Sequence, residues 1–375
     1  MSFPIVLSNG PPDAAGLKTV SDAGVTTIRT GRGDWAAAQL DAQIAQERAR
    51  LDAAHTAGLT CWVWLGALTN LGPNASDANL RKVVDALHDH PALGAWKGHD
   101  EPRNPFTPSK SVPPDNLARG HRVIASIDGA HPVVIIQAPR GDVNGLIPYR
   151  PAFDITGADI YPVGYPPGTH SDRKNADLSV VGDVTQWIRN AAGTKPVWMT
   201  LQVAWSGVLP PGHVPRFPSN ADLRFMAYQA IANGARGLAF FGGHLEQVMT
   251  PADVATGWNW TYWRETLQPV VSELASTALA PALTASPSKA NVRTSPKVPG
   301  VEIATRETGG FLYVFAARRS GTTSQVGFAG IPTSVTAGQV LFEYADGEFR
   351  SFPVSRGAFR DWFAPHDAHV YRFKL

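Results

Sequence analysis

The sequence predicts an α/β fold, a (β/α)8 TIM barrel followed by a small antiparallel β-sandwich. Up to about residue 283, short apolar runs alternate with longer amphipathic segments, the order that builds a parallel sheet covered by helices. The apolar runs are continuous, as in strands buried on both faces. Eight such strands, all but the fifth followed by a helical segment, indicate a closed barrel. Beyond residue 300 the hydrophobic period changes to two, which is typical of an antiparallel sheet.

The expected barrel elements follow these periods along the chain. We expect strands at residues 3–8, 25–30, 59–65, 93–102, 132–137, 153–161, 195–202 and 235–241. We expect helices at residues 14–23, 35–57, 77–88, 115–127, 178–192, 223–233 and 263–280. Ser219 and Asp222 form a capping-box pattern before the sixth of these helices, and Gly234 is a C-cap signal after it.

The barrel is predicted to span residues 1–283, a linker 284–299 and the β-sandwich 300–375. The linker is rich in Pro, Ser, Thr and Ala, which indicates a boundary. Alternating runs beyond it predict strands at 301–305, 311–315, 325–328, 340–344 and 369–373. No ionisable cluster is evident in the sandwich sequence, so we expect its role to be structural.

Composition and charge exclude several classes of function. The net charge is +2 with Lys and Arg scattered, which argues against nucleic acid and membrane partners. Neither a Walker loop nor a dinucleotide fingerprint is present, so no cofactor is expected. Cys61 is the only cysteine, and the first residues do not form a signal peptide. The protein is then cytoplasmic, or its export signal has been removed; the oligomeric state stays open.

The stretch Leu93-Gly-Ala-Trp-Lys-Gly-His-Asp-Glu-Pro102 begins as a buried strand and ends in three ionisable side chains. In a parallel barrel the carboxyl ends of the strands form the catalytic rim; the alternative is a salt-bridged loop that caps a helix. The other expected strand ends complete a candidate site with the following members: Arg29, Asp34, Trp64, His99, Asp100, Glu101, Gln137, Asp159, Tyr161, Gln202, Trp205, His244 and Glu246.

Carboxylates beside aromatic side chains favour cleavage of glycosidic bonds. We expect Glu101 to be the general acid, because the charge of Asp100 raises its pKa. Asp159 or Asp100 is the expected base, across a sugar-sized gap, and Trp64, Trp205 and Tyr161 the expected sugar platform. Other tryptophans near strand ends, such as Trp258 and Trp263, either stack on sugars or pack in the core. No Gly-x-Ser-x-Gly elbow or His-x-His pair supports acyl transfer or a metal centre.

Three smaller assignments stay open at this point. His99 either orients Asp100 or contacts substrate. Arg29 either holds a rim carboxylate ionised or touches substrate. Asp159 either lines the site or caps a loop, and His244 and Glu246 lie beyond Gly242-Gly243 on a loop whose course the sequence does not define.

The segment Trp96-Lys-Gly-His-Asp-Glu-Pro102 resembles the fourth-strand motif of the (β/α)8-barrel glycoside hydrolases of the large retaining clan, with Asp100 in place of the usual Asn. It is more similar to an uncharacterised Asp-Glu-Pro branch of barrel hydrolase-like proteins. The segments 90–96, 158–162, 195–202, 224–228, 234–241 and the tail 361–371 share this resemblance, which therefore covers nearly the whole chain. It implies a carbohydrate substrate, a barrel and an appended β-sandwich.

One position departs from that clan. Gln202 stands where the resemblance implies the nucleophilic glutamate of the seventh strand, and an amide cannot act as a nucleophile or base. The sequence leaves three interpretations: inverting or atypical hydrolysis with another carboxylate, retention with a different nucleophile, or a non-catalytic carbohydrate-binding or scaffold barrel.

Overall fold

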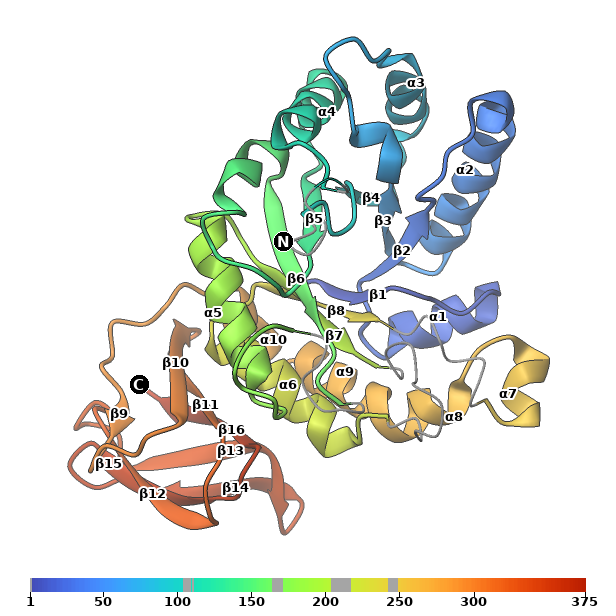
Figure 1. Cartoon of the computed structure of the whole chain (residues 1–375). Helices are drawn as coiled ribbons and strands as arrows, with labels where there is room; N and C mark the ends of the chain where they lie inside the picture. Colours follow the sequence, from blue (N-terminus) through green and yellow to red (C-terminus); the bar gives the residue numbers. More distant parts are fainter. Residues whose placement is uncertain (1, 104–108, 110, 164–170, 204–216, 242–248) are drawn as a thin grey trace, which may run out of the picture.

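The computed structural model describes residues 2–103, 109, 111–163, 171–203, 217–241 and 249–375. Eight parallel strands close into a barrel through pairing of the first strand with the last, so the expected (β/α)8 architecture is confirmed (Figure 1). The strands are β1 (Ile5–Leu7), β2 (Thr27–Gly31), β3 (Thr60–Trp64), β4 (Leu93–Lys97), β5 (Val133–Gln137), β6 (Ile155–Ile160), β7 (Trp198–Gln202) and β8 (Gly237–Phe241).

Helices surround this barrel (Figure 1). They are α1 (Ala14–Asp22), α2 (Leu40–Thr56), α3 (Ala78–Leu87), α4 (Pro114–Ile127), α5 (Val180–Ala192), α6 (Asn220–Ala232), α7 (Pro251–Thr256), α8 (Trp260–Tyr262), α9 (Gln268–Ala275) and α10 (Ala280–Thr284). The capping box at Ser219 and Asp222 is present. The single helix expected at 263–280 is instead a π-helical turn at Trp263–Leu267 followed by α9, which has a proline in its first turn. Among the described residues, no helix has the length and apolar character that a membrane span requires.

The barrel interior is a packed core. It contains Val6, Trp62, Ala95, Val134, Ile136, Ile155, Trp198 and Ala239. Trp62 and Trp198 meet edge-on with ring centroids 6.1 Å apart and fill the axis, as large side chains do in barrels of this size. Because the interior is filled, a substrate has access only to the ends of the barrel.

The C-terminal region is a two-sheet β-sandwich. One sheet has the order β10-β11-β16-β13-β14 and the other β15-β12-β9. The strands are β9 (Arg293–Thr294), β10 (Val301–Thr308), β11 (Phe311–Arg318), β12 (Ser324–Ala329), β13 (Ala337–Ala345), β14 (Glu348–Pro353), β15 (Ala358–Phe363) and β16 (Asp367–Lys374). Each of the five expected runs lies in a strand. β9 falls within the segment 284–299, so part of that segment pairs with the sandwich.

The sandwich packs against α5 and α6 (Figure 1). Tyr313, Phe315 and Leu341 belong to the same buried cluster as Phe225 of α6. Arg319 forms an ion pair of 2.6 Å with Asp183 of α5. Apolar burial and a charged contact therefore join the two regions along one face of the barrel.

A buried ionisable cluster lies in the sandwich, contrary to the expectation from its sequence. His369 bonds through Nδ1 to Glu343 and through Nε2 to Asp367 at 3.1 Å, so both ring nitrogens face carboxylates. Arg350 bridges Glu343 and Asp361. Burial lowers the pKa of His369, but these hydrogen bonds and charges outweigh it and raise the pKa to about 9. The members are spread over β13–β16, so only the fold brings them together.

This cluster predicts alkaline destabilisation. The folded pKa of His369 lies above the unfolded value, so its contribution is fully present below pH 6.5 and is lost as the pH rises through about 9. We expect the free energy of unfolding to fall on the order of 3 kcal/mol over this range. In His369→Gln the free energy of unfolding should be lower at pH 6 and nearly constant to pH 9.5. Urea denaturation at each pH measures this, with the exposed His55→Gln as control; parallel curves for His369→Gln and wild type would contradict it.

Candidate active site

The residues after β4 turn across the mouth of the barrel. Gly98 N–H donates to Val134 O and Glu101 N–H to Ile136 O, both at 2.9 Å, so the chain continues along β5 beyond the end of β4. Glu101 has φ +41°, in the left-handed region that a side chain bearing a Cβ rarely adopts. Backbone strain of this kind concentrates at functional sites. As a whole residue Glu101 is exposed, although its carboxyl is surrounded closely enough for burial to raise its pKa.

The carboxyl groups of Glu101 and Asp159 are hydrogen-bonded to each other. Asp159 is buried on β6, and burial followed by the charge of Glu101 raises its pKa well above the usual value. Burial and then Asp100 raise the pKa of Glu101, while the hydrogen bond from Asp159 opposes this. Because two carboxyls in contact repel each other when both are ionised, the pair favours keeping one proton. The sugar-sized gap expected between these two residues is absent.

Asp100 is held by Lys97. The Lys97 ammonium is buried in the barrel mouth and forms an ion pair with the half-exposed Asp100 carboxylate. Its Nζ lies 4.5 Å from the ring centroid of Trp64 and 5.7 Å from that of Trp62. Burial lowers the pKa of Lys97, and the charge of Asp100 opposes this. Sequence reasoning missed Lys97, although a lysine within an otherwise buried strand was a visible signal.

Arg29, Trp64 and Tyr161 complete the group. The Arg29 guanidinium lies 5.1 Å from the Trp64 ring centroid and donates through Nε to the Ser8 carbonyl at 3.1 Å. Burial lowers the pKa of Arg29, whereas Asp100 raises it. Tyr161 bonds to Asp159, and its pKa is raised well above the usual value, mainly by burial. Tyr161 therefore stays a neutral phenol, and its ring stacks on Phe241 with centroids 5.3 Å apart.

Three other expected site residues lie apart from this group or make structural contacts. The His99 imidazole donates from Nδ1 to the Asp100 carbonyl at 2.8 Å, a contact that orients the backbone of its neighbour. Alternate residues of a strand point to the same face, so the Gln137 side chain lies on the same face of β5 as Ile135. Ile135 packs outside the barrel, whereas Ile136 packs in its interior. Asp34 is largely exposed and lies 3.6 Å from Arg32. Trp205, His244 and Glu246 lie outside the described residues.

Gln202 is buried, and both ends of its side-chain amide are hydrogen-bonded. Its Oε1 accepts from Val163 N–H at 2.8 Å, and its Nε2 donates to Val163 O. A carboxylate could accept the first bond but not donate the second. The amide thus anchors the chain that follows β6, beside the position of Tyr161.

We therefore expect Gln202→Glu to destabilise the protein without creating a nucleophile. A carboxylate would face the Val163 carbonyl in a buried site, at a cost of about 1–3 kcal/mol. Thermal denaturation measures the loss, and Gln325→Glu at an exposed position of β12 is the matched control. An unchanged melting temperature for Gln202→Glu would refute the two-bond assignment.

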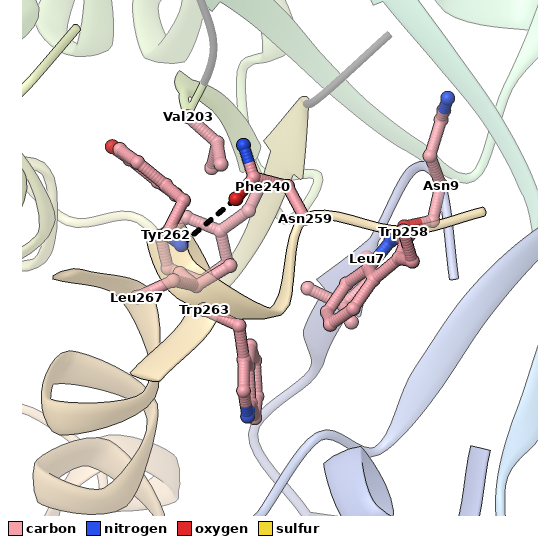
Figure 2. A pocket seen from close by; sticks show the side chains of 9 residues that line it. All are labelled: Leu7, Asn9, Val203, Phe240, Trp258, Asn259, Tyr262, Trp263 and Leu267. Carbon is pink, nitrogen blue, oxygen red and sulfur yellow. Dashed lines mark hydrogen bonds between the residues drawn. The ribbon is translucent and has the colours of Figure 1, made fainter. Parts of the chain in front are cut away.

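A small cavity lies beside the mouth, between β1, β8 and the segment around α8. Figure 2 shows its lining, which includes Leu7, Phe240, Trp258 and Trp263. Its volume is about 10 Å³, room for at most one water. The Trp258 indole donates to the Asn9 carbonyl at 3.2 Å, so Trp258 and Trp263 pack in the core and do not serve as sugar platforms.

Comparison with known proteins finds similarity of structure only. No protein-family model matches the chain, and no curated protein sequence matches it. Its structure is similar to a glycoside hydrolase family 5 protein from Bacteroides vulgatus (TM-score 0.65, 13% identity, 99% of this chain and 89% of that chain). It is also similar to an α-amylase from Geobacillus thermoleovorans (TM-score 0.57, 10% identity, 100% of this chain and 99% of that chain). A third similar structure is a GH30 endoxylanase from Clostridium papyrosolvens (TM-score 0.54, 10% identity, 100% of this chain and 97% of that chain). The chain thus has the fold of the (β/α)8-barrel glycoside hydrolases, with a C-terminal β-domain.

Proposed function

We propose that the protein hydrolyses O-glycosidic bonds of an oligosaccharide or polysaccharide. The observation that carries this proposal is the hydrogen-bonded Glu101–Asp159 carboxyl pair at the mouth of the barrel, in which both pKa values are raised. A carboxyl that remains protonated near neutral pH is what a glycosidic leaving oxygen requires. The fold shared with glycoside hydrolases supports the same reaction class.

The hydrogen bonds assign a role to each carboxyl. Asp159 donates to Glu101 and is buried, while Glu101 is exposed. Glu101 gives its proton to the leaving oxygen as the glycosidic C–O bond breaks, and Asp159 stores the proton between turnovers. The Tyr161 hydroxyl donates to Asp159 and holds its orientation.

Asp100 is the second carboxylate in this scheme. Because Glu101 and Asp159 are in contact, no sugar fits between them, and Asp159 cannot act from the opposite side of the bond. The Lys97 ammonium forms an ion pair with the Asp100 carboxylate. Asp100 then stabilises the positive charge that develops on the sugar ring, or accepts a proton from the water that attacks the anomeric carbon. An inverting outcome requires the acid and base to stand about 6.5–9.5 Å apart around that water.

One observation favours a second candidate, a carbohydrate-binding barrel without turnover. Gln202 occupies the position of the nucleophile implied by the family resemblance, and its amide is bonded to Val163. A panel of aryl glycosides and of plant, fungal and bacterial glycans separates the two candidates. Release of reducing sugar supports hydrolysis. Saturable glycan binding with no product from any substrate supports the binding barrel.

A further inference from the structure

A second cavity is lined in part by Arg29 and Trp64 of the candidate site. Its volume is about 550 Å³, large enough for a monosaccharide unit with part of its neighbour. At the end next to the barrel mouth it is lined by Ser8, Asn9, Arg29, Arg32, Asp34 and Trp64. Trp64 connects the two places, because the same ring lies 4.5 Å from the Nζ of Lys97, which pairs with Asp100.

Two guanidinium groups of this cavity lack a close, buried carboxylate partner among the described residues, although the charge of Asp100 acts on Arg29 from farther away. Arg29 is partly buried, yet no carboxylate of the described chain lies within 4.0 Å of it, and its guanidinium donates hydrogen bonds to the Ser8 carbonyl and to the Asn9 side chain. The Nε of Arg32 is buried without a hydrogen bond among the described residues. Its partner Asp34 is largely exposed and 3.6 Å away, so solvent screens that pair.

A partly buried cation without a paired anion is costly unless a ligand supplies the anion. The planar fork of an arginine matches a carboxylate in a bidentate arrangement. From these two observations together we propose that the cavity binds the carboxylate of a uronic acid, so that the natural substrate is an acidic glycan. This inference rests on the proposed hydrolysis only for the statement that the sugar is a substrate; binding of the uronate is independent of it.

The test compares sugars that differ only at C6. Isothermal titration of the Glu101→Gln protein with glucuronate- and galacturonate-containing oligosaccharides is set against the matched neutral oligosaccharides and 6-sulfated neutral sugars. The corresponding 4-nitrophenyl uronides and neutral glycosides are assayed with the wild type. We expect uronates to bind at least about 10-fold more tightly than neutral sugars, and Arg29→Gln and Arg32→Gln each to remove most of this preference. Arg81→Gln, at an exposed arginine of α3, is the control and should keep it.

The outcomes separate this inference from the proposed function. Uronate preference in both binding and hydrolysis supports both. Uronate-selective binding without cleavage keeps the inference and removes the hydrolase. Cleavage of neutral and acidic sugars at equal rates keeps the hydrolase and overturns the inference. Equal binding of all sugars, tighter binding of the sulfated sugar than of the uronate, or a uronate preference that survives both arginine substitutions also overturns it.

Discussion

Glu101→Gln is expected to lower kcat/KM for any glycoside that the wild type cleaves by about 10²–10⁴-fold, the usual contribution of a general acid. The amide has nearly the same shape and can still accept a hydrogen bond from Asp159, but it cannot give a proton to the leaving oxygen. Because Glu101 is exposed, the melting temperature should change little. Initial rates with aryl glycosides of graded leaving-group pKa measure the effect, which should be smallest for the best leaving group.

The control for this prediction is Glu307→Gln, at a solvent-exposed position of β10. It removes the same charge from the sandwich and should leave kcat/KM at the wild-type value. If Glu101→Gln keeps more than a tenth of the activity against every leaving group, then Glu101 is not the acid.

Asp159→Asn is expected to reduce kcat roughly 10²-fold and to shift the pH dependence of the remaining activity. The asparagine amide still donates to Glu101 but cannot hold a proton. In the wild type, repulsion between the two carboxylates keeps the last proton on the pair as the pH rises. Without that repulsion the last proton is lost at lower pH, so the alkaline limb of the kcat profile should move toward acid.

A pH–rate series on both proteins checks this shift. Asp89→Asn, at an exposed aspartate after α3, should reproduce the wild-type profile. An Asp159→Asn profile with an unchanged alkaline limb would show that Asp159 does not share the catalytic proton, even if the rate falls for structural reasons.

The order of barrel elements was predictable because it depends on local hydrophobic period. Each expected barrel strand overlaps an observed one, and the sharp change of period after residue 300 marks the sandwich. The helix expected at 263–280 was not predicted correctly, since its one proline, Pro269, lies in the first turn of α9, which follows a π-helical turn and ends at Ala275. Strands β14 and β15 were not predicted; in β15 only Phe359, Asp361 and Phe363 alternate with exposed residues over a short run.

The sequence predicted which strand ends contribute to the site, but it did not predict the contacts between their side chains. Glu101, Asp100 and Asp159 do interact with one another, because β4 and β6 end at the same mouth. The direct bond between Glu101 and Asp159 joins two distant segments, and Glu101 has a left-handed backbone; no local pattern encodes either feature. Gln137 was expected to line the site but lies on the outer face of β5, as Ile135 does. The position of a strand end alone does not tell which face of the strand its last side chain occupies.

The docking of the sandwich on α6 has a consequence for how this chain can change. Phe225 of α6 and Phe315 of β11 belong to the same buried cluster. Each region alone would therefore expose apolar side chains that the other region covers. Loss of about the last 75 residues would expose an apolar patch of the barrel surface to water, which favours aggregation. We therefore regard barrel and sandwich as one structural unit, in which a substitution on one side of their interface must be compensated by a substitution on the other.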